Sequence, residues 1–456
     1  MTKLFGTNGV RGVVNETMTV ELAGDLSRAI GTFFGGGKVA IGCDTRTSAD
    51  MLKSASISGL LSAGCSVVDL GTVPSPTLQF EVKKGDYSGG IIITASHNPP
   101  EFNGIKCVDS DGLEMDKAGE EAIEEIYFSR KFQSVEWKNC KGVLTKGDSI
   151  DNYVSSIVNN VDAESVGQVN LKVVLDCGNG ATCLSSPKIL NSLGCEPILL
   201  NETPDGTFPG HDSEPIPENL SELMRVVVDS GAAIGIAHDG DGDRTIFIDE
   251  NGNYIYGDKT LALMARRIVE ERLGGLVVTP VSSSSCVEEA VKKAGGEVKY
   301  TAVGSPIVAR VMRETGAVFG GEENGGLIFP EHQFCRDGGM AMAKVLELLA
   351  LSGEKFSRHL KDVPVYHTVK KKVHCPNEKK VDLLEGLARR YEGEEVDTTD
   401  GVKVLYSDGW VLIRPSGTEP LFRIFAESKL EERAKELVEE GVRVITDLIE
   451  STKRDQ

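Results

Sequence analysis

Three aspartates, Asp239, Asp241 and Asp243, alternate with two glycines in the segment 239–243. Alternate residues of an extended loop can direct their side chains to one side, and the glycines let the chain curl around an ion. Three carboxylates this close repel one another unless a cation lies between them, and oxygen ligands favour Mg²⁺, Mn²⁺ or Ca²⁺ over Zn²⁺. The segment therefore predicts a divalent-metal site.

Two other interpretations of this segment stay open. Counted from Asp239, Glu250 holds the twelfth position, as in an EF-hand calcium loop. Against an EF-hand, Arg244 holds the sixth position, where that loop needs glycine, and the flanking residues 232–237 and 245–248 favour strands. The third interpretation is a solvated acidic loop without a bound ion.

A second stretch, 94–106, could carry a phosphoryl group on a serine. It reads Thr-Ala-Ser-His-Asn-Pro-Pro-Glu-Phe-Asn-Gly-Ile-Lys and follows the apolar run 91–93, which is typical of a buried parallel strand. Ser96 thus lies just beyond the C-terminal end of a strand, where open α/β sheets bind ligands. Pro99 and Pro100 stop a helix, so we expect an exposed loop. A helix cap or a turn is the alternative role for Ser96.

The heptapeptide that starts at Arg414, Arg-Pro-Ser-Gly-Thr-Glu-Pro, is typical of an anion-binding loop. Arg414 offers a planar pair of donors, and Ser416 and Thr418 add hydroxyl groups. Gly417 lets backbone N–H groups face inward, and Arg423 could add a second guanidinium. A plain turn between two strands is the alternative interpretation.

The glycine-rich segment 321–326, Gly-Glu-Glu-Asn-Gly-Gly, carries Glu322 and Asn324 two residues apart. Their carboxylate and amide could together hold adjacent hydroxyl groups of a sugar. Acidic glycine-rich turns without a ligand are also common, so this segment indicates a sugar site only in combination with the three segments described above.

Two loops near the N-terminus are polar as well. Segment 5–12 has three glycines and one cation, Arg11, which favours a close approach of the backbone to a ligand; a flexible turn is the alternative. Asp44 and Arg46, in the segment 43–48, could line a site, but a local ion pair with a capping role is the simpler interpretation.

Composition limits the class of protein. The chain has 456 residues, of which 40% are hydrophobic and 26% are charged, as in globular proteins of several domains. A net charge of −20 argues against binding to nucleic acids or anionic membranes, but not against an anionic small molecule. No apolar run reaches the ~18–20 residues of a membrane span, and the first residues lack an apolar signal region. With ten cysteines and no C-x-x-C pair, we expect a cytoplasmic protein with reduced thiols.

The combination of a metal loop, a carrier serine and an anion-binding loop indicates phosphoryl transfer. The sequence has no G-x-x-x-x-G-K-[S/T] loop and no G-x-S-x-G pentapeptide. Both absences argue against P-loop nucleotide enzymes and α/β-hydrolases.

The elements that precede these loops must position them. Over most of the chain, short apolar segments alternate with segments of helical periodicity, which predicts mostly parallel sheets joined by helices. From residue 366 onward, strand-like segments follow one another, and Asp408-Gly409 is typical of a hairpin turn. We therefore expect α/β domains followed by a small α+β domain, with the polar stretch 138–148 as a linker.

These four loops, in this order and spread over the whole chain, resemble those of the α-D-phosphohexomutase family. Segment 94–100 resembles its phosphoserine loop, 239–244 its metal loop, 321–326 its sugar loop and 414–420 its phosphate loop. The resemblance implies four domains in a heart-shaped arrangement around a cleft. Three are related α/β domains with mixed, mostly parallel sheets, and the fourth is a smaller α+β domain. Each domain carries one of the four loops in turn; we expect the boundaries 1–149, 150–254, 255–364 and 365–456.

The resemblance also implies roles for single residues. One Mg²⁺ per subunit would be held by oxygen atoms of phosphorylated Ser96, Asp239, Asp241 and Asp243. The groups around the transferred phosphate would be Arg11, His97, Lys106 and Arg244, with Lys106 as one candidate base. Glu322 and Asn324 would contact sugar hydroxyls. The other phosphate would be bound by Arg414, Ser416, Gly417, Thr418 and Arg423.

The implied reaction moves a phosphoryl group between O6 and O1 of a hexose through phospho-Ser96 and a 1,6-bisphosphate, which is also the expected activator. Segment 5–12 resembles the glucosamine-phosphate branch, although Asn8 and Val10 replace its usual Asp and Ile. Asn324 and Gly326 make the sugar loop similar to archaeal members, some of which accept several hexoses. We expect conversion of glucosamine 6-phosphate, with a phosphomannomutase/phosphoglucomutase as the alternative and a non-catalytic sugar-phosphate- or metal-binding protein as the hypothesis from another class. The resemblance also allows a homodimer.

Overall fold

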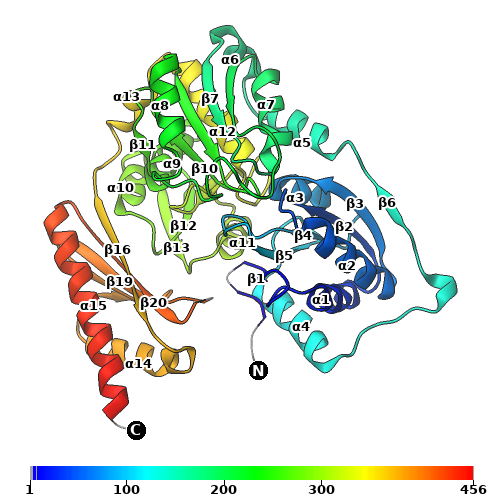
Figure 1. Cartoon of the computed structure of the whole chain (residues 1–456). Helices are drawn as coiled ribbons and strands as arrows, with labels where there is room; N and C mark the ends of the chain where they lie inside the picture. The colour runs from blue at the N-terminus through cyan, green and yellow to red at the C-terminus, as the bar shows by residue number, and fades with distance from the viewer. Residues whose placement is uncertain (1–3, 7, 418, 455–456) are drawn as a thin grey trace.

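The structure, a computed structural model, describes residues 4–6, 8–417 and 419–454. It has three α/β domains and a smaller C-terminal domain with an antiparallel sheet, which confirms the expected fold class. The first domain lies at the right of Figure 1 and the C-terminal domain at the lower left, with the other two above and between them. In the described part of the chain, no helix combines the length and the apolar character needed to cross a membrane.

The first domain is a mixed six-stranded sheet with the strand order β1-β5-β4-β2-β3-β6. Its elements in chain order are β1 (Val10–Val13), α1 (Val20–Phe33), β2 (Lys38–Cys43), α2 (Ala49–Ser62), β3 (Ser66–Thr72), α3 (Ser75–Lys84), β4 (Gly89–Ile93), β5 (Phe102–Asp109), α4 (Lys117–Ser129), the 3₁₀ turn η1 (Trp137–Asn139) and β6 (Val143–Thr145).

Both faces of this sheet are buried, which explains the unbroken apolar run in β4. Ile91 and Ile93 pack in the core that also contains Leu26, Leu52 and residues of α4. Ile92, between them, points to the opposite face, which α3 covers. Successive residues of a strand alternate between faces, so a strand with helices on both sides must be apolar throughout.

Two expectations for this domain were wrong. The stretch 94–106 is a loop only up to residue 101, because β5 follows and pairs antiparallel with β4. The stretch 138–148 is more than a linker, since β6 within it extends the sheet by pairing parallel with β3. β5 and β1 make the sheet mixed, because both of their pairings are antiparallel.

The second and third domains follow the same α/β plan. The second has the strand order β11-β10-β9-β7-β8 and the third β13-β12-β14-β15. The elements of the second domain are α5 (Ser149–Val158), α6 (Ala163–Val169), β7 (Lys172–Asp176), η2 (Ala181–Leu184), α7 (Ser186–Ser192), β8 (Glu196–Leu200), α8 (Ser221–Ser230), β9 (Ile234–His238), β10 (Thr245–Ile248) and β11 (Tyr254–Ile255). Those of the third are α9 (Gly257–Glu271), β12 (Leu276–Pro280), α10 (Ser285–Lys293), β13 (Glu297–Thr301), α11 (Ser305–Thr315), β14 (Phe319–Gly321), β15 (Leu327–Ile328), α12 (Gly338–Ser352) and α13 (Phe356–Leu360).

One hydrophobic core joins the second and third domains. It contains Leu175 and Phe247 from the second sheet, Val277 and Phe319 from the third, and most of the apolar face of α12. Helix α12 belongs to the third domain by sequence, yet it packs against α5, α6 and α7 of the second. The loops at the ends of β9 and β14 are therefore held on one continuous support.

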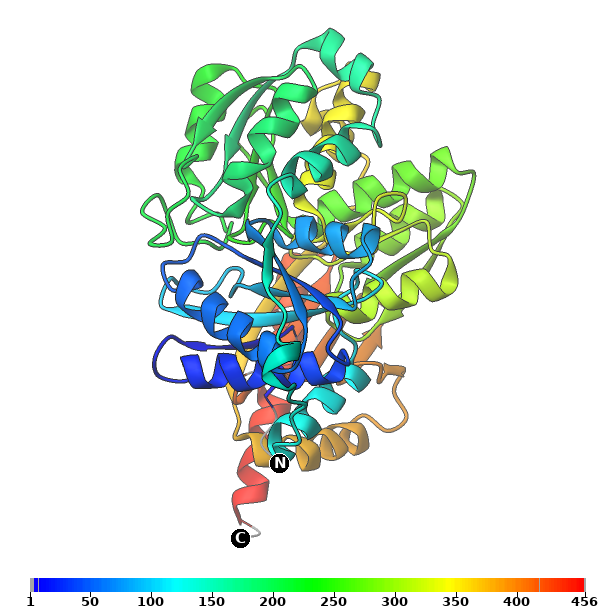
Figure 2. The ribbon, with the colours of Figure 1, turned by 90° about the vertical axis from the view of Figure 1, so that its right-hand side faces the viewer.

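The fourth domain has an antiparallel sheet with the order β16-β20-β19-β18-β17. Its elements are β16 (His367–His374), η3 (Asn377–Lys379), α14 (Lys380–Arg390), β17 (Val396–Asp397), β18 (Val402–Tyr406), β19 (Gly409–Pro415), β20 (Leu421–Ser428) and α15 (Glu431–Arg454). A hairpin between β18 and β19 contains Asp408, as the sequence predicts. The view of Figure 2 places the first domain in front of the strands of the fourth, with α15 at the edge of the molecule.

Candidate active site

Ser96 lies just beyond the C-terminal end of β4, and its hydroxyl faces the second domain. Ser96 Oγ donates to Asp239 Oδ2 at 2.8 Å, and its backbone N–H donates to Thr94 Oγ1 at 2.9 Å. The residue has φ +53°, a left-handed conformation that is uncommon outside glycine and often marks functional sites.

The Ser96 loop is not exposed, contrary to expectation, because Ser96 retains only 2% of its accessible surface. The metal loop of the second domain covers it. A Cβ atom added to Gly240 would lie 2.7 Å from the carbonyl oxygen of Ser96, so only glycine permits this approach of the two backbones. Sequence alone could not show this cover, since it comes from residues about 140 positions away.

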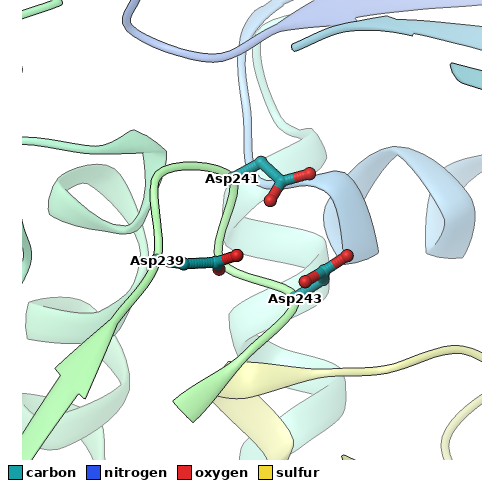
Figure 3. A group of neighbouring side chains, drawn as sticks. All are labelled: Asp239, Asp241 and Asp243. Carbon is teal, nitrogen blue, oxygen red and sulfur yellow. The ribbon is translucent and has the colours of Figure 1, made fainter. Parts of the chain in front are cut away.

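The three aspartates gather at the loop that joins β9 to β10, as Figure 3 shows. One carboxylate oxygen from each lies within 4.8 Å of the others, and all three side chains are buried. The flanking elements are strands, so the EF-hand interpretation is excluded. Burial of the triad at an interface between domains also excludes a solvated acidic loop.

The oxygen atoms of this triad suit a hard divalent cation. Oδ1 of Asp241 and Oδ1 of Asp243 are buried and have no hydrogen-bond partner among the described residues. Such atoms are costly to bury unless another group binds them, and carboxylate oxygens are the ligands that Mg²⁺ prefers. Asp239, Asp241 and Asp243, with Ser96 beside them, therefore fit a Mg²⁺ site.

Lys106 joins this site from β5. Its Nζ donates to Asp241 Oδ2 at 2.6 Å and lies 3.2 Å from Asp243 Oδ2. Burial lowers the pKa of a lysine, but the charges of Asp241 and Asp243 outweigh it and raise the pKa of Lys106. In this arrangement Lys106 is a charged donor that neutralises part of the triad.

Two arginines and a histidine complete the surroundings of Ser96. Arg244 Nε donates to Asp239 Oδ2 at 2.8 Å, and its Nη2 is buried without a partner among the described residues. Arg11 Nη1 donates to the carbonyl of Ala95 at 3.0 Å. His97 Nδ1 lies 3.4 Å from Ser96 Oγ. Arg244, burial and Arg11 all lower the pKa of His97, which favours its neutral form.

The sugar loop reaches this site through a residue that the sequence did not reveal. Arg336 Nη1 donates to Glu322 Oε2 at 2.7 Å, and its Nη2 donates to Asp243 Oδ2 at 2.5 Å. Arg336 precedes Asp337, the N-cap of α12. Its partners lie 14 and 93 positions away in the sequence, so no local pattern marks it. Asn324 is exposed, and its Oδ1 accepts from the backbone N–H of Gly326 at 3.1 Å.

The two predicted phosphate-binding arginines stand side by side on neighbouring strands. Arg414 of β19 pairs in register with Arg423 of β20. Each is held by a carboxylate of its own domain: Arg414 Nε donates to Asp400 Oδ2 at 2.8 Å, and Arg423 Nη2 donates to Glu419 Oε2 at 2.6 Å. The terminal nitrogens of Arg414 take no part in its contact with Asp400.

The loop between these strands contains the other predicted residues. Ser416 Oγ accepts from the backbone N–H of Glu419 at 3.1 Å, and Gly417 is exposed. Thr418 lies outside the described residues. Lys380, at the start of α14, donates to the carbonyls of Ser416 and Glu419 at 2.6 and 2.7 Å. Sequence reasoning missed Lys380, because a lysine in the first turn of a helix is common on protein surfaces.

Comparison with known proteins accounts for all four domains. Residues 2–134, 151–252 and 256–366 match the families described as phosphoglucomutase/phosphomannomutase, alpha/beta/alpha domains I, II and III. Residues 371–444 match the phosphoglucomutase/phosphomannomutase C-terminal domain. A solved structure of a phosphoglucomutase/phosphomannomutase family protein from Burkholderia thailandensis superposes with a TM-score of 0.85, at 29% identity over 97% of both chains.

Curated relatives are similar over nearly their whole length. A phosphoglucomutase/phosphomannomutase of Thermococcus kodakarensis is 45% identical over 98% of this chain and 100% of its own. A probable phosphoglucosamine mutase of Methanopyrus kandleri is 44% identical over 99% and 100%. A phosphoglucosamine/phosphogalactosamine mutase of Sulfurisphaera tokodaii is 41% identical over 98% and 99%. These matches confirm the resemblance inferred from the four loops, and the chain belongs to the phosphoglucomutase/phosphomannomutase family.

Proposed function

We propose that the protein is a phosphohexomutase, an isomerase that moves a phosphoryl group between O6 and O1 of a hexose, with glucosamine 6-phosphate as its preferred substrate. The observation that carries the proposal is the contact of the Ser96 hydroxyl with the aspartate triad that fits a metal ion: Ser96 Oγ lies 2.8 Å from Asp239 Oδ2. Arg11, Arg244 and Lys106 contact groups next to this hydroxyl: the carbonyl of Ala95, Asp239 and Asp241. A serine in that place can carry a phosphoryl group whose charge is balanced by nearby cations.

The reaction begins with phosphorylated Ser96. The free hydroxyl of a hexose monophosphate forms a bond to phosphorus, the bond from phosphorus to Ser96 Oγ breaks, and the hydroxyl proton passes to a base. The resulting 1,6-bisphosphate turns round and returns its other phosphoryl group to Ser96. A hexose 1,6-bisphosphate from solution would load an unphosphorylated serine and thereby act as an activator.

The charged groups around Ser96 have separable tasks in this proposal. Arg244 has a buried terminal nitrogen without a partner among the described residues, which supports a contact with a phosphate oxygen. Arg11 donates to the carbonyl of Ala95 and to Asn98, so it holds the serine loop as well as adding charge. The three aspartates and a phosphoserine oxygen would hold Mg²⁺, which would supply positive charge to stabilise the transferred phosphoryl group.

The fourth domain would bind the phosphate that is not transferred. The paired guanidiniums of Arg414 and Arg423 support this role, because two such groups side by side suit a dianion. Ser416, Gly417 and Thr418, in the loop between the two strands, would add hydroxyl and backbone donors. Glu322 and Asn324 would accept from sugar hydroxyls.

Two observations support glucosamine as the sugar. Several relatives that are 40–44% identical are named probable phosphoglucosamine mutases. The sugar loop also carries two consecutive glutamates, Glu322 and Glu323, and carboxylates suit a substrate with an ammonium group. The relative named phosphoglucomutase/phosphomannomutase makes the corresponding mannose and glucose activities the second candidate. A homodimer and a cytoplasmic location stay predictions.

Two experiments test this proposal. Intact-mass analysis after incubation with a hexose 1,6-bisphosphate should show one added phosphate, absent in Ser96→Ala, and that variant should lose mutase turnover. Ser56→Ala is the matched control, because Ser56 is equally buried but lies on α2, away from the triad. A protein that never takes up phosphate would instead be a binding protein. For the sugar, kcat/KM should be highest with glucosamine 6-phosphate; if it is the poorest of the glucosamine, mannose and glucose phosphates, the substrate assignment is wrong.

A further inference from the structure

Arg46 lies directly behind the Ser96 loop and takes no part in the chemistry described above. It follows β2, the parallel neighbour of β4, and only 2% of its surface is accessible. Its guanidinium donates to four carbonyl oxygens of one short stretch of chain. These acceptors are Ser96 O at 2.8 Å, Asn98 O at 2.6 Å, Pro99 O at 2.6 Å and Phe102 O at 2.9 Å.

The fifth N–H donor of Arg46, at Nε, links the guanidinium through Asp44 to Thr94. Arg46 Nε donates to Asp44 Oδ2 at 3.2 Å, and the same oxygen accepts from Thr94 Oγ1 at 2.6 Å. Thr94 Oγ1 in turn accepts from the backbone N–H of Ser96 at 2.9 Å. Both backbone polar groups of Ser96 are therefore fixed by one network, its carbonyl directly by Arg46 and its N–H through Thr94 and Asp44.

A loop of the second domain, which contains Gly206, Phe208 and Ser213, packs against this network. The ring of Phe208 lies 5.1 Å from the Arg46 guanidinium, and Ser213 Oγ donates to Asn98 O at 3.1 Å. A Cβ atom added to Gly206 would lie 2.3 Å from the carbonyl oxygen of Thr45, so this loop presses on the backbone beside Arg46. The guanidinium is thus enclosed between the two domains that meet at Ser96.

We infer that Arg46 is a positioning residue for phosphoryl transfer, which holds Ser96 in the left-handed conformation that directs its hydroxyl at the metal triad. A non-glycine residue keeps such a conformation only when its surroundings over-determine it. Arginine alone offers five donors in a rigid plane, whereas the ammonium of lysine offers three from one point. This inference rests on the proposed function, since it assigns Arg46 to the transfer step at Ser96.

A purely structural role for Arg46 predicts something different. It would lower thermal stability on substitution and leave the turnover of the folded enzyme unchanged. A positioning role predicts a loss of kcat with little change in KM, because the groups proposed to bind the sugar and the distal phosphate lie in the third and fourth domains. Misplacement of a reacting group by about 1 Å costs about 100-fold in rate.

The test compares Arg46→Lys with wild type in steady-state kinetics and in phosphate loading of Ser96 by a hexose 1,6-bisphosphate, followed by intact mass. We expect kcat and the loading rate to fall about 100-fold, with KM within threefold of wild type. Arg225→Lys, on the exposed face of α8, is the control and should change neither. A kcat within threefold of wild type for folded Arg46→Lys would overturn the inference.

Thr94→Val keeps the inference testable if Arg46→Lys does not fold. Valine has nearly the shape of threonine but removes the bond to the Ser96 N–H while leaving Arg46 in place, so we expect kcat to fall about 10-fold. An unchanged kcat in this variant would also count against the network. Failure of the proposed function is distinguishable, because wild-type protein would then show neither turnover nor phosphate on Ser96.

Discussion

Replacing Arg336 by methionine removes the cation that joins the metal loop to the sugar loop. Its side chain is 10% exposed, and its partners Asp243 and Glu322 are 3% and 4% exposed. The substitution therefore leaves two buried carboxylates without the charge between them. Removing one partner of a buried ion pair costs about 3–5 kcal/mol, so we expect Arg336→Met to unfold about 10 °C below wild type at pH 8.

The pH dependence of this loss follows from Glu322. Burial raises the pKa of Glu322, and Arg336 opposes that rise. Without Arg336 the pKa rises further, so the folded variant takes up a proton at mildly acidic pH that the unfolded chain does not hold. Stability of the variant is then lost as the pH rises above the unfolded pKa of Glu322. The difference in unfolding temperature from wild type should be larger at pH 8 than at pH 5.5.

Mg²⁺ should restore part of this stability. A ligand that binds only the folded state at 100 times its Kd adds about 2.7 kcal/mol. Wild type should gain less than Arg336→Met, in which Asp243 has lost a cation that Mg²⁺ replaces. Differential scanning calorimetry with and without MgCl₂ measures both effects. Arg225→Met is the control, since Arg225 is 62% exposed and its ion pairs contribute less than about 1 kcal/mol.

Two results would refute this reasoning. One is an unfolding temperature for Arg336→Met within 2 °C of wild type at pH 8, which would mean that Arg336 does not balance buried charge. The other is an equal response of both proteins to Mg²⁺, which would show that Arg336 does not influence the carboxylates proposed to bind the metal.

Three further predictions concern the metal, the distal phosphate and pH. Asp241→Ala should weaken Mg²⁺ binding at least tenfold in calorimetric titration; an unchanged Mg²⁺ dependence would contradict the metal site. Asp400→Asn removes the charge that holds Arg414 Nε at 2.8 Å, so KM should rise about tenfold with kcat within twofold, and an unaltered KM would exclude this role. Burial lowers the pKa of His211, but the hydrogen bond and charge of Asp176 raise it overall. The stability that this pair gives is full below the unfolded histidine pKa and is lost as pH rises through the folded one, so His211→Gln should cost less at pH 9 than at pH 6; a constant difference in unfolding temperature would be inconsistent with the pair.

The sequence predicted the α/β plan and the three parallel strands that meet at the centre of the first domain, because each strand contains two or three consecutive apolar residues. It did not predict β5. That strand contains Asn103 and Lys106, which are 0% and 2% exposed, in place of the apolar residues that mark a buried strand. Lys106 is buried because its charge is balanced by two aspartates from another domain. Because the site requires polar residues on β5, this strand lacks the apolar pattern from which a buried strand is predicted.

The sequence also singled out the segment 239–243 and the Ser96 loop, which the structure brings together, because the polar residues of each lie close together in the chain. It did not predict a role for Arg336 at the site, and for Arg46 the simpler prediction was only a local ion pair. The expected local pair of Asp44 and Arg46 is present, yet Arg46 also donates to carbonyls about 50 positions away. Hydrogen bonds from an arginine to backbone carbonyls cannot be predicted from residue types, since every residue has a carbonyl. Only the fold determines which carbonyls face it.

The charges at the site explain why metal and phosphate should bind together. Four carboxylates, Asp239, Asp241, Asp243 and Glu322, face four cations, Arg11, Lys106, Arg244 and Arg336. The buried Glu114 adds a fifth carboxylate near Lys106 and Arg336, so the cluster is slightly negative before any ligand enters. Mg²⁺ alone would make the cluster positive, and a phosphoserine alone would make it strongly negative. Uncompensated charge is costly in a buried site. Bound Mg²⁺ should therefore favour the phosphoserine, and the phosphoserine should favour the binding of Mg²⁺. Because such coupling is reciprocal, phosphorylation of Ser96 should raise the affinity for Mg²⁺ by the factor by which Mg²⁺ stabilises the phosphoserine.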